Sequence, residues 1–310
     1  MILFYNIRGD NMKILCIGHA AYDITIPLDK FVIENTKNRV DERVECGGGP
    51  ASNAAYLLGK WGCDVTFMGV VGNDEYGRYI KKELDSVNVN TDYLELSSEY
   101  KTTSSFIIAN KSNGTRTILT YRPKEMKMKE IDLSFEPDII LVDGQEYNVS
   151  DKILKKYPKA ISIIDAGRTT EEIIDLAKKV KYLVCSKDFA EKMTNEKFDF
   201  DNLNSLSIIY QRMKDIFKNE VIITLENHGV LYEHNHKLKL LSGIKKKAID
   251  TTGAGDIFHG AFTYGISQRW EIEKVIRLAN VTAGLSVTKI GGRFSIFDLD
   301  GIKELYNEFK

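Results

Sequence analysis

The chain has 310 residues, of which 43% are hydrophobic and 28% charged, as is ordinary for a globular protein with a sizeable core. Its net charge of -1, with both signs interspersed, argues against a nucleic-acid-binding or membrane surface, and no apolar run approaches the roughly 20 residues of a membrane span. Four cysteines without paired spacing predict free thiols in a cytoplasmic protein.

A second methionine, Met12, stands directly before the first predicted strand, and Arg8-Gly9-Asp10 lies just upstream of it. Codons for this tripeptide can spell a bacterial ribosome-binding site. We therefore expect a native start at Met12, with residues 1–11 as a non-native or disordered extension. The alternative is a genuine N-terminal arm.

Short apolar runs alternate with amphipathic stretches along the rest of the chain, a pattern typical of β-α units around a parallel sheet. Strands are predicted at 13–18, 65–70, 139–143, 160–165, 182–185 and 221–224. Helices are predicted at 51–61, 75–87, 171–179, 203–218, 256–268, 272–288 and 299–308. The expected fold class is therefore α/β, with a central, mostly parallel sheet flanked by helices.

One region breaks this alternation. Residues 103–109 and 115–121 are strand-like runs rich in β-branched and aromatic residues, and Asn113-Gly114 between them is a hairpin signal. A small antiparallel β-sheet lid outside the main body would combine these runs with 24–26 and 43–45. The expected units are a large domain of 12–21, 46–100 and 124–310, and a lid of 22–45 and 101–123.

Polar and small residues follow the first predicted strand and precede the first helix. Asp23 lies at the carboxyl end of that strand, where α/β sheets bind ligands, and its carboxylate could accept two hydroxyl groups or serve only in a turn. Asn53, one turn into the next helix, offers both a donor and an acceptor. A close backbone approach to a ligand, or a hinge for the lid, is predicted for Gly47, Gly48 and Gly49.

The segment 250–256, which reads Asp-Thr-Thr-Gly-Ala-Gly-Asp, is the most informative in the chain. Gly253, Ala254 and Gly255 precede an apolar stretch with helical spacing, so they lie at a helix N-terminus, where unpaired N–H groups can hold a phosphate. Asp256 is the one carboxylate of the first turn. It could accept a proton from a hydroxyl that attacks the phosphate, or act only as a helix cap.

Two other nucleotide-binding motifs are excluded by spacing. The dinucleotide fingerprint needs a third glycine where Phe258 stands, and the Walker A motif needs a Gly-Lys-Ser/Thr sequence that the chain lacks. An NAD-dependent dehydrogenase is therefore not expected. The segment 250–256 instead predicts a phosphoryl-transfer site.

Two segments together resemble the signatures of the ribokinase-like or PfkB carbohydrate kinases. Residues 250–261 resemble the C-terminal signature, and 47–59 resembles the N-terminal one, a glycine pair followed by Asn and a helix that ends in Gly. With 69–74 and the order of elements between them, the resemblance covers essentially the whole chain. It implies transfer of the γ-phosphoryl group of ATP, with Mg²⁺, to a sugar hydroxyl, most simply a terminal CH2OH.

The resemblance also implies a role for each candidate residue. Asp256 would be the base, and the amides of Gly253, Ala254 and Gly255 the anion hole. Asp23, the glycine triplet and Asn53 would bind the sugar. Contacts to the nucleotide are implied for Ser186, Thr224, Gly229 and Asn280, although a surface helix position is an equal alternative for Asn280. Some members hold a monovalent cation such as K⁺ at the positions of Asp250, Thr252, Ser286, Lys289, Gly291 and Ser295.

Two positions depart from the family pattern. Glu226 replaces the first glycine of a Thr-x-Gly-x-x-Gly loop, which would bring a carboxylate near the phosphates, and Phe189 replaces a Glu that many members use in handling magnesium and phosphate. Two arginines, Arg122 and Arg168, could contact an anionic substituent on the sugar, with surface or structural roles as the alternative.

The identity of the acceptor stays open. The motifs 259–261 and 291–293 resemble those of ketose kinases such as those for fructose or sulfofructose, and ribose is a second candidate. A nucleoside kinase would show an aromatic wall in the lid, for which Phe106 is a candidate. A non-catalytic sugar- or nucleotide-binding protein is the alternative from another class. In several members two lids pack together, so a homodimer through the lid is a further expectation.

Overall fold

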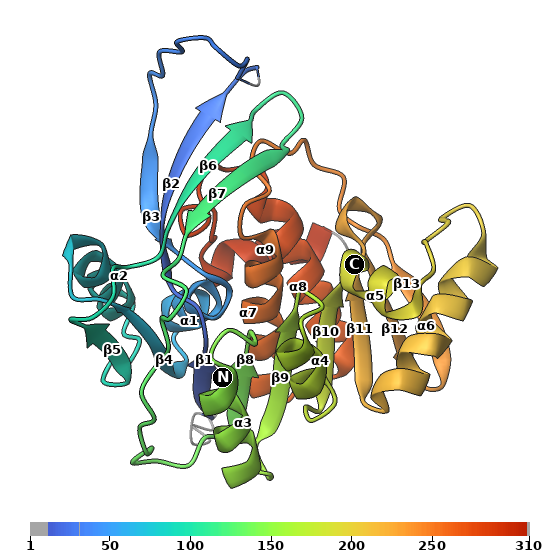
Figure 1. Ribbon diagram of the computed structural model, residues 1–310. Helices are drawn as coiled ribbons and strands as arrows, with labels where there is room; N and C mark the ends of the chain where they lie inside the picture. The colour runs from blue at the N-terminus through green and yellow to red at the C-terminus, as the bar shows by residue number, and fades with distance from the viewer. Residues whose placement is uncertain (1–11, 31, 309–310) are drawn as a thin grey trace, which may run out of the picture.

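In the computed structural model, which describes residues 12–30 and 32–308, the chain forms an α/β body from which a β lid rises (Figure 1). The expected extension 1–11 lies outside the described residues. Within the described ranges, no helix is long and apolar enough to cross a membrane.

Within the described residues, the large sheet has nine strands in the order β13-β12-β11-β10-β9-β8-β1-β4-β5. Neighbouring strands are parallel along the sheet from β5 through β4, β1, β8, β9 and β10 to β11. Beyond β11, the strands β12 and β13 extend this edge with antiparallel pairing. All four residues of β8 are buried, as expected for a strand covered on both faces. The bounds are β1 (Lys13–Ile17), β4 (Asp64–Gly72), β5 (Leu94–Ser97), β8 (Ile139–Val142), β9 (Ile161–Ala166), β10 (Tyr182–Ser186), β11 (Glu220–Thr224), β12 (Val230–His234) and β13 (Lys237–Leu241).

Helices cover both faces of this sheet. Alternate residues of β1 enter different cores: Ile14 packs with α1, α2, α7, α8 and α9, whereas Leu15 packs with α3, α4, α5 and α6. The helices are α1 (Pro50–Lys60), α2 (Glu75–Ser86), α3 (Tyr147–Lys156), α4 (Glu171–Ala177), α5 (Lys187–Thr194), α6 (Leu203–Phe217), α7 (Ala254–Ser267), α8 (Ile272–Ser286) and α9 (Leu299–Glu308). A short 3₁₀ turn, η1, spans Glu226–His228.

The predicted α/β class is confirmed, and each predicted strand and helix is present with ends shifted by at most three residues. One shift matters for the site: the helix expected at 256–268 begins earlier, at Ala254, so Asp256 is its third residue. The elements that the sequence did not predict are β5, β12, β13, α3, α5 and the short turn η1.

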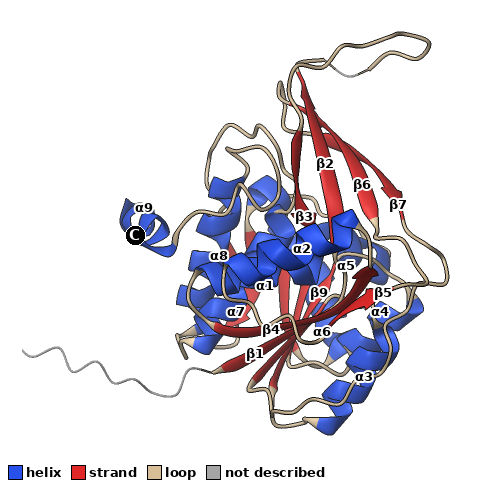
Figure 2. Cartoon of the chain, turned by 90° about the vertical axis from the view of Figure 1, so that its left-hand side faces the viewer, coloured by secondary structure: helices blue, strands red, loops and turns tan. Residues whose placement is uncertain are grey.

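The lid is a four-stranded sheet in the order β3-β2-β6-β7, formed by β2 (Ala21–Leu28), β3 (Val44–Gly48), β6 (Ser104–Asn110) and β7 (Arg116–Tyr121). Two of its pairings are antiparallel, as expected, but the central pair β2-β6 is parallel. The reason lies in the connections, because β2 and β6 both leave the body in the same direction and each returns through its own partner strand (Figure 2).

The register of the lid fixes which side chains face the body. Asp23 pairs with Ser105 and Ser105 with Thr120, so these three polar groups share one face. The neighbouring row pairs Phe106 with Ile24 and Leu119 and therefore occupies the opposite face.

Candidate functional site

The start of α7 is shaped as the sequence predicted. Gly253 caps the helix in a left-handed conformation, with φ of 75°, and Asp256 is the acidic residue of the first turn. The side-chain amide of Asn53 donates a hydrogen bond to Asp256 Oδ2 at 2.7 Å. Burial raises the pKa of Asp256, whereas the bond from Asn53 and the charge of His259 act in the opposite direction. The structure thus joins the N-terminal and C-terminal motifs in one site.

A buried arginine, which the sequence analysis named only as part of the motif 291–293, orients Asn53. Arg293, which is 2% exposed, donates from Nε to the Asn53 Oδ1 at 3.3 Å and from Nη1 to Glu83 Oε2 at 2.7 Å. Its Nη2 donates to the hydroxyl of Ser52. Because Arg293 occupies the acceptor oxygen of Asn53, the amide NH2 is directed at Asp256. The three bonds make Arg293 the structural centre of the acceptor side.

Asp23 lies on the lid face that turns toward the body and is 7% exposed. Burial raises its pKa to about 6, a hydrogen bond with Ser105 opposes the rise, and the charge of Asp256 adds to it. A Cβ on Gly48 would lie 1.9 Å from Asp23 Oδ2, so glycine at this position is required for the side chain of Asp23 to pack where it does.

The other two glycines of the triplet also make room for groups of the protein. A Cβ on Gly47 would lie 2.2 Å from Arg293 Nη1, and one on Gly49 would lie 2.4 Å from the carbonyl oxygen of His19. Gly49 also has a φ of 94°, which favours glycine. At all three positions, the place that a side chain would take is therefore filled by the protein itself.

A carboxylate at the end of β8 ties this region together. Asp143 accepts backbone N–H bonds from His19 at 2.7 Å, Gln145 at 2.9 Å and Ala51 at 3.2 Å. It thereby connects the segment after β1 with the first turn of α1. The sequence analysis placed Asp23 at the carboxyl end of the first strand, but β1 ends at Ile17 and Asp23 is the third residue of the lid strand β2. The carboxylate that does follow a parallel strand of the large sheet is Asp143, which the sequence analysis overlooked.

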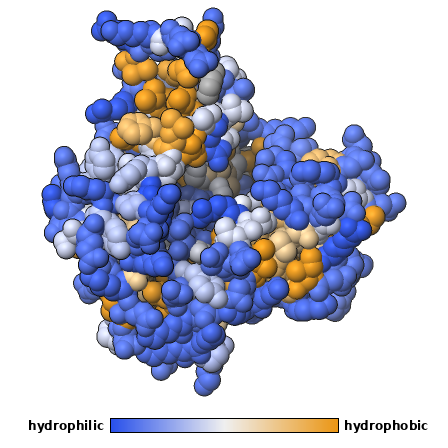
Figure 3. All heavy atoms as spheres, in the orientation of Figure 1, coloured by the Kyte–Doolittle hydropathy of each residue, from blue (hydrophilic) through white to orange (hydrophobic). Residues whose placement is uncertain are grey.

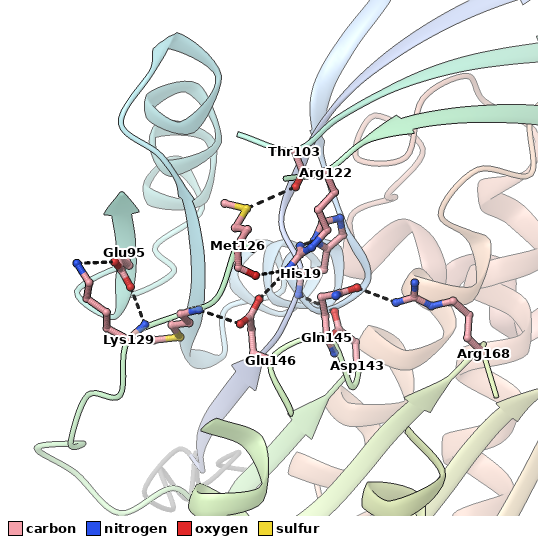
Figure 4. A network of polar contacts seen from close by, with 11 residues as sticks. His19, Glu95, Thr103, Arg122, Met126, Lys129, Asp143, Gln145, Glu146 and Arg168 are labelled. Atoms are coloured by element: carbon pink, nitrogen blue, oxygen red, sulfur yellow. Dashed lines mark hydrogen bonds and ion pairs between the residues drawn. The ribbon is translucent and has the colours of Figure 1, made fainter. Parts of the chain in front are cut away.

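Beside Asp143, a second network joins the lid to the body (Figure 4). Arg122 contacts His19 Nδ1 at 2.7 Å and forms an ion pair with Glu146 Oε1 at 3.1 Å. Burial and the charges of Arg122 and Arg168 lower the pKa of His19 to about 3, so the ring is neutral and Nδ1 accepts the bond from Arg122. The Arg122 guanidinium is therefore already bonded to His19 and Glu146.

Arg168 behaves differently from Arg122. Its side chain is exposed, donates to Gln145 Oε1 at 2.7 Å and borders a cavity of about 380 Å³ that Gln145 and Glu146 also line. Within the described residues, its side chain makes no hydrogen bond to Asp23 or Asn53. It lies at the rim of the site rather than among the residues around Asp256.

The residues expected to contact a nucleotide lie at the ends of β10 and β11. Ser186 Oγ accepts the N–H of Phe189 at 3.1 Å and caps α5, while Phe189 is buried in the core. Thr224 donates to the carbonyl of Cys185 at 3.2 Å. Glu226 has a left-handed φ of 55° and forms an ion pair with Lys187 at 2.9 Å. Lys187 thus offsets the negative charge that the sequence analysis expected near the phosphates.

Two further residues predicted for the nucleotide side have clear structural contacts. A Cβ on Gly229 would lie 1.9 Å from the carbonyl oxygen of Leu241, so this glycine permits close packing of the segments that flank β12 and β13. Asn280 donates from Nδ2 to the carbonyl of Ser242 at 2.9 Å. The amide of Asn280 thus holds α8 against the chain that follows β13.

The predicted monovalent-cation residues gather in one buried, oxygen-rich place. Asp250 accepts N–H bonds from Thr252 and Gly291, both at 2.9 Å, and is 2% exposed. The Thr252 hydroxyl is buried and has no hydrogen-bond partner in the described part of the chain. Lys289 turns its ammonium over the ring of Phe297, away from this place. The remaining members are also buried: Ser286, Gly291 and Ser295.

Comparison with known proteins shows the family of the chain and supports its fold. A family model described as pfkB family carbohydrate kinase matches residues 11–298. The chain is 25% identical to a ribokinase of Staphylococcus aureus over 94% of its length and 99% of the relative, and 24% identical to a nucleoside kinase of Methanocaldococcus jannaschii over 96% and 97%. The structure of Arabidopsis thaliana ribokinase complexed with ribose and ATP superposes with a TM-score of 0.78 at 20% identity, covering 95% of this chain and 98% of that one.

Proposed function

The chain belongs to the pfkB family of carbohydrate kinases, and we propose that it transfers the γ-phosphoryl group of ATP to the terminal CH2OH of a free sugar, a ketose such as fructose or the aldose ribose. Kinases of this family transfer phosphate to a hydroxyl group, so the protein is a phosphotransferase of the sugar or nucleoside kinase class. The observation that carries the finer proposal is the bond of 2.7 Å between Asn53 and Asp256, which joins a donor-acceptor amide to the carboxylate at the start of α7.

Each residue of the proposed site has a distinct task. Asp23 and Asn53 bind hydroxyl groups of the sugar and hold the reacting one beside Asp256, which accepts its proton as the oxygen attacks phosphorus. The first-turn amides at Gly253, Ala254 and Gly255 hold the transferred phosphoryl group. The transition state of phosphoryl transfer is loose, so positioning and charge stabilisation matter more than the strength of the base.

One observation favours a sugar over a nucleoside. Phe106, the candidate aromatic wall, belongs to the row that pairs with Ile24 and Leu119, on the lid face opposite to Asp23. A base bound beside the sugar would therefore not stack on it. The non-catalytic alternative rested on Glu226 and Phe189, and the ion pair with Lys187 and the burial of Phe189 give both residues structural explanations.

Two ions accompany the proposal. Within the described residues no group of three acidic, histidine or cysteine side chains could hold a metal ion, which fits Mg²⁺ carried mainly by the ATP phosphates, whose charge it would neutralise. The buried carboxylate of Asp250 and the unpartnered hydroxyl of Thr252 fit K⁺, bound with carbonyl or hydroxyl oxygens of Ser286, Lys289, Gly291 and Ser295.

The outer face of the lid supports the proposed homodimer. Phe106, Leu119 and Tyr121 share this face and are 48%, 61% and 56% exposed. Figure 3 shows the apolar groups gathered on the lid while most of the body surface is polar. Contiguous exposed apolar side chains commonly mark an interface. Light scattering should give twice the chain mass, and Leu119→Asp should give the monomer; a monomeric wild-type protein at micromolar concentration would contradict the proposal.

Release of ADP tests the function directly. The protein is mixed with ATP and Mg²⁺ and with a panel of ketoses, aldoses, sugar acids and nucleosides, in K⁺ and in Na⁺ buffers. We expect ADP release above background with one ketose or with ribose, and faster turnover in K⁺. Turnover with nucleosides alone would replace the proposal by a nucleoside kinase, and turnover with sugar acids alone would assign a role to Arg168.

A further inference from the structure

His259 is a buried histidine one turn beyond Asp256 on α7, and the proposed mechanism does not use it. Its side chain is nearly enclosed, with 4% of the residue exposed. Positions separated by three residues lie on the same face of a helix, so the ring is beneath the carboxylate of Asp256 and not on the far side of α7. Because His259 is ionisable and lies next to the proposed base, its charge affects the ionisation of Asp256.

Both ring nitrogens of His259 face oxygen atoms that accept hydrogen bonds. Nδ1 lies 2.7 Å from the carbonyl oxygen of Gly255 and 3.2 Å from Oδ2 of Asp165. Nε2 lies 3.1 Å from the carbonyl oxygen of Val184. A neutral imidazole has one N–H and one lone pair, and either tautomer would direct that lone pair at an oxygen. Only the imidazolium form, with two N–H groups, satisfies both sides of the ring.

Asp165 provides the counter-charge. It is the penultimate residue of β9 and has a side chain that is 15% exposed. Burial raises the pKa of Asp165 to about 6, and the charge of His259 opposes this rise, so Asp165 is mainly a carboxylate at pH 7. A buried charge is tolerated when it is paired and hydrogen-bonded, as both members of this pair are.

The surrounding charges also favour a cation at His259. Negative groups predominate on the elements packed around it, and the buried thiol of Cys185 has a raised pKa and is neutral. Asp143, which follows β8, and Arg168, which follows β9, act on Asp165, and Arg116 of the lid acts on Asp256.

We propose that Asp165 holds His259 as an imidazolium, and that this buried cation is a positioning residue for the reaction, fixing the first turn of α7 through Gly255 and keeping Asp256 ionised. Its positive charge lies behind the helix N-terminus that receives the phosphoryl group, so it adds to the field of the unpaired N–H groups there. The proposal rests on the proposed function for its kinetic part. The charge state of His259 stands independently of it.

Nitrogen NMR of the histidine rings measures the charge without any substrate. The chain has five histidines, and His259→Asn identifies the signals of His259. We expect both ring nitrogens of His259 to show imidazolium shifts from pH 6 to 8, and Asp165→Asn to convert the ring to a neutral tautomer within that range. A neutral His259 at pH 7 in the wild-type protein would overturn the proposal, whatever the enzyme phosphorylates.

Kinetics then separates positioning from a purely structural role. In His259→Gln we expect kcat to fall about 10- to 100-fold with the KM of the acceptor unchanged, because a nearby charge is lost while no sugar contact is removed. The acid limb of the kcat profile should move to higher pH, since the charge that favours ionised Asp256 is gone. His234→Gln is the matched control, because His234 lies on β12 and its Nε2 is 4.0 Å from Glu273 Oε2. Unchanged kcat and pH profile in a folded His259→Gln protein would contradict the positioning role.

Discussion

The acceptor side of the cleft, around Asn53 and Asp256, and the proposed nucleotide side, around Ser186 and Glu226, hold their polar groups in different ways. On the acceptor side, side chains bond to side chains across long sequence separations, as from Asn53 to Asp256 and to Arg293. On the nucleotide side, Ser186 caps its own helix and Glu226 forms an exposed ion pair.

This difference predicts which substitutions should have large effects on activity. A buried network leaves its members unpaired when one is lost, which costs more than the loss of an exposed contact. Acceptor-side changes should therefore reduce turnover or sugar affinity strongly, whereas changes such as those at Glu226 should be mild. The four predictions below test this contrast in order of decreasing effect.

Asp256→Asn should lower kcat by about 10²- to 10⁴-fold, because the amide cannot accept the proton of the attacking hydroxyl. Steady-state ADP release measures kcat, and calorimetry measures binding of the sugar, which should persist. Asp300→Asn is the matched control, since Asp300 occupies the first turn of α9. Turnover of Asp256→Asn within threefold of the wild type would show that the carboxylate is not the base.

Gly48→Ala should lower kcat/KM for the sugar by about 10²-fold, the cost of displacing a positioning group by about 1 Å. The added Cβ would lie 1.9 Å from Asp23 Oδ2 and must displace that carboxylate. Gly301→Ala provides the control, because a Cβ at Gly301 on α9 meets no atom within 4 Å. Equal kcat/KM values of the two variants would mean that the position of the Asp23 carboxylate does not affect the reaction.

The pH dependence of kcat/KM should show the ionisation of Asp23, whose pKa burial raises to about 6. The carboxylate is the form that accepts sugar hydroxyls, so kcat/KM should fall about tenfold per unit below pH 6. Between about pH 4 and 6 the folded state binds this proton more tightly than the unfolded state, so the contribution of Asp23 to stability rises as pH falls. A profile that stays flat to pH 5 would contradict the account, and melting curves at each pH distinguish loss of activity from unfolding.

Glu226→Gly should change the KM for ATP less than threefold and the free energy of unfolding by less than about 1 kcal/mol. It removes one exposed ion pair, to Lys187, and relieves a left-handed conformation that glycine adopts freely. Kinetics at varied ATP and urea unfolding measure the two quantities. A large change in ATP KM would show that the carboxylate takes part in nucleotide binding and would weaken the contrast between the two sides.

The sequence predicted the fold well because its βα units are strongly patterned. The lid needed more: the Asn113-Gly114 signal predicted the hairpin, but nothing local to the chain reveals that β2 and β6 pair in parallel. Strand direction within a sheet depends on where distant segments leave the body, which periodicity does not encode.

In the candidate site, too, the sequence predicted the features that have local signals and missed those that depend on distant contacts. The motif around Asp256 predicted the helix N-terminus, because small residues and an apolar stretch are local signals. Arg293 and Glu83 were missed because Arg293 meets Asn53 and Glu83 only after folding, across 240 and 210 residues of chain. The pair of His259 and Asp165 was missed for the same reason, although the motif contains His259.

The position of the phosphate on the product tests the central proposal most directly. Phosphorus-proton correlation NMR of the product made from ATP and the acceptor found in the panel identifies the carbon that carries the phosphate. We predict coupling of phosphorus to the two protons of a terminal CH2 group of a free sugar. Coupling to a ring or anomeric proton, or a product that is a nucleoside monophosphate, would contradict the account.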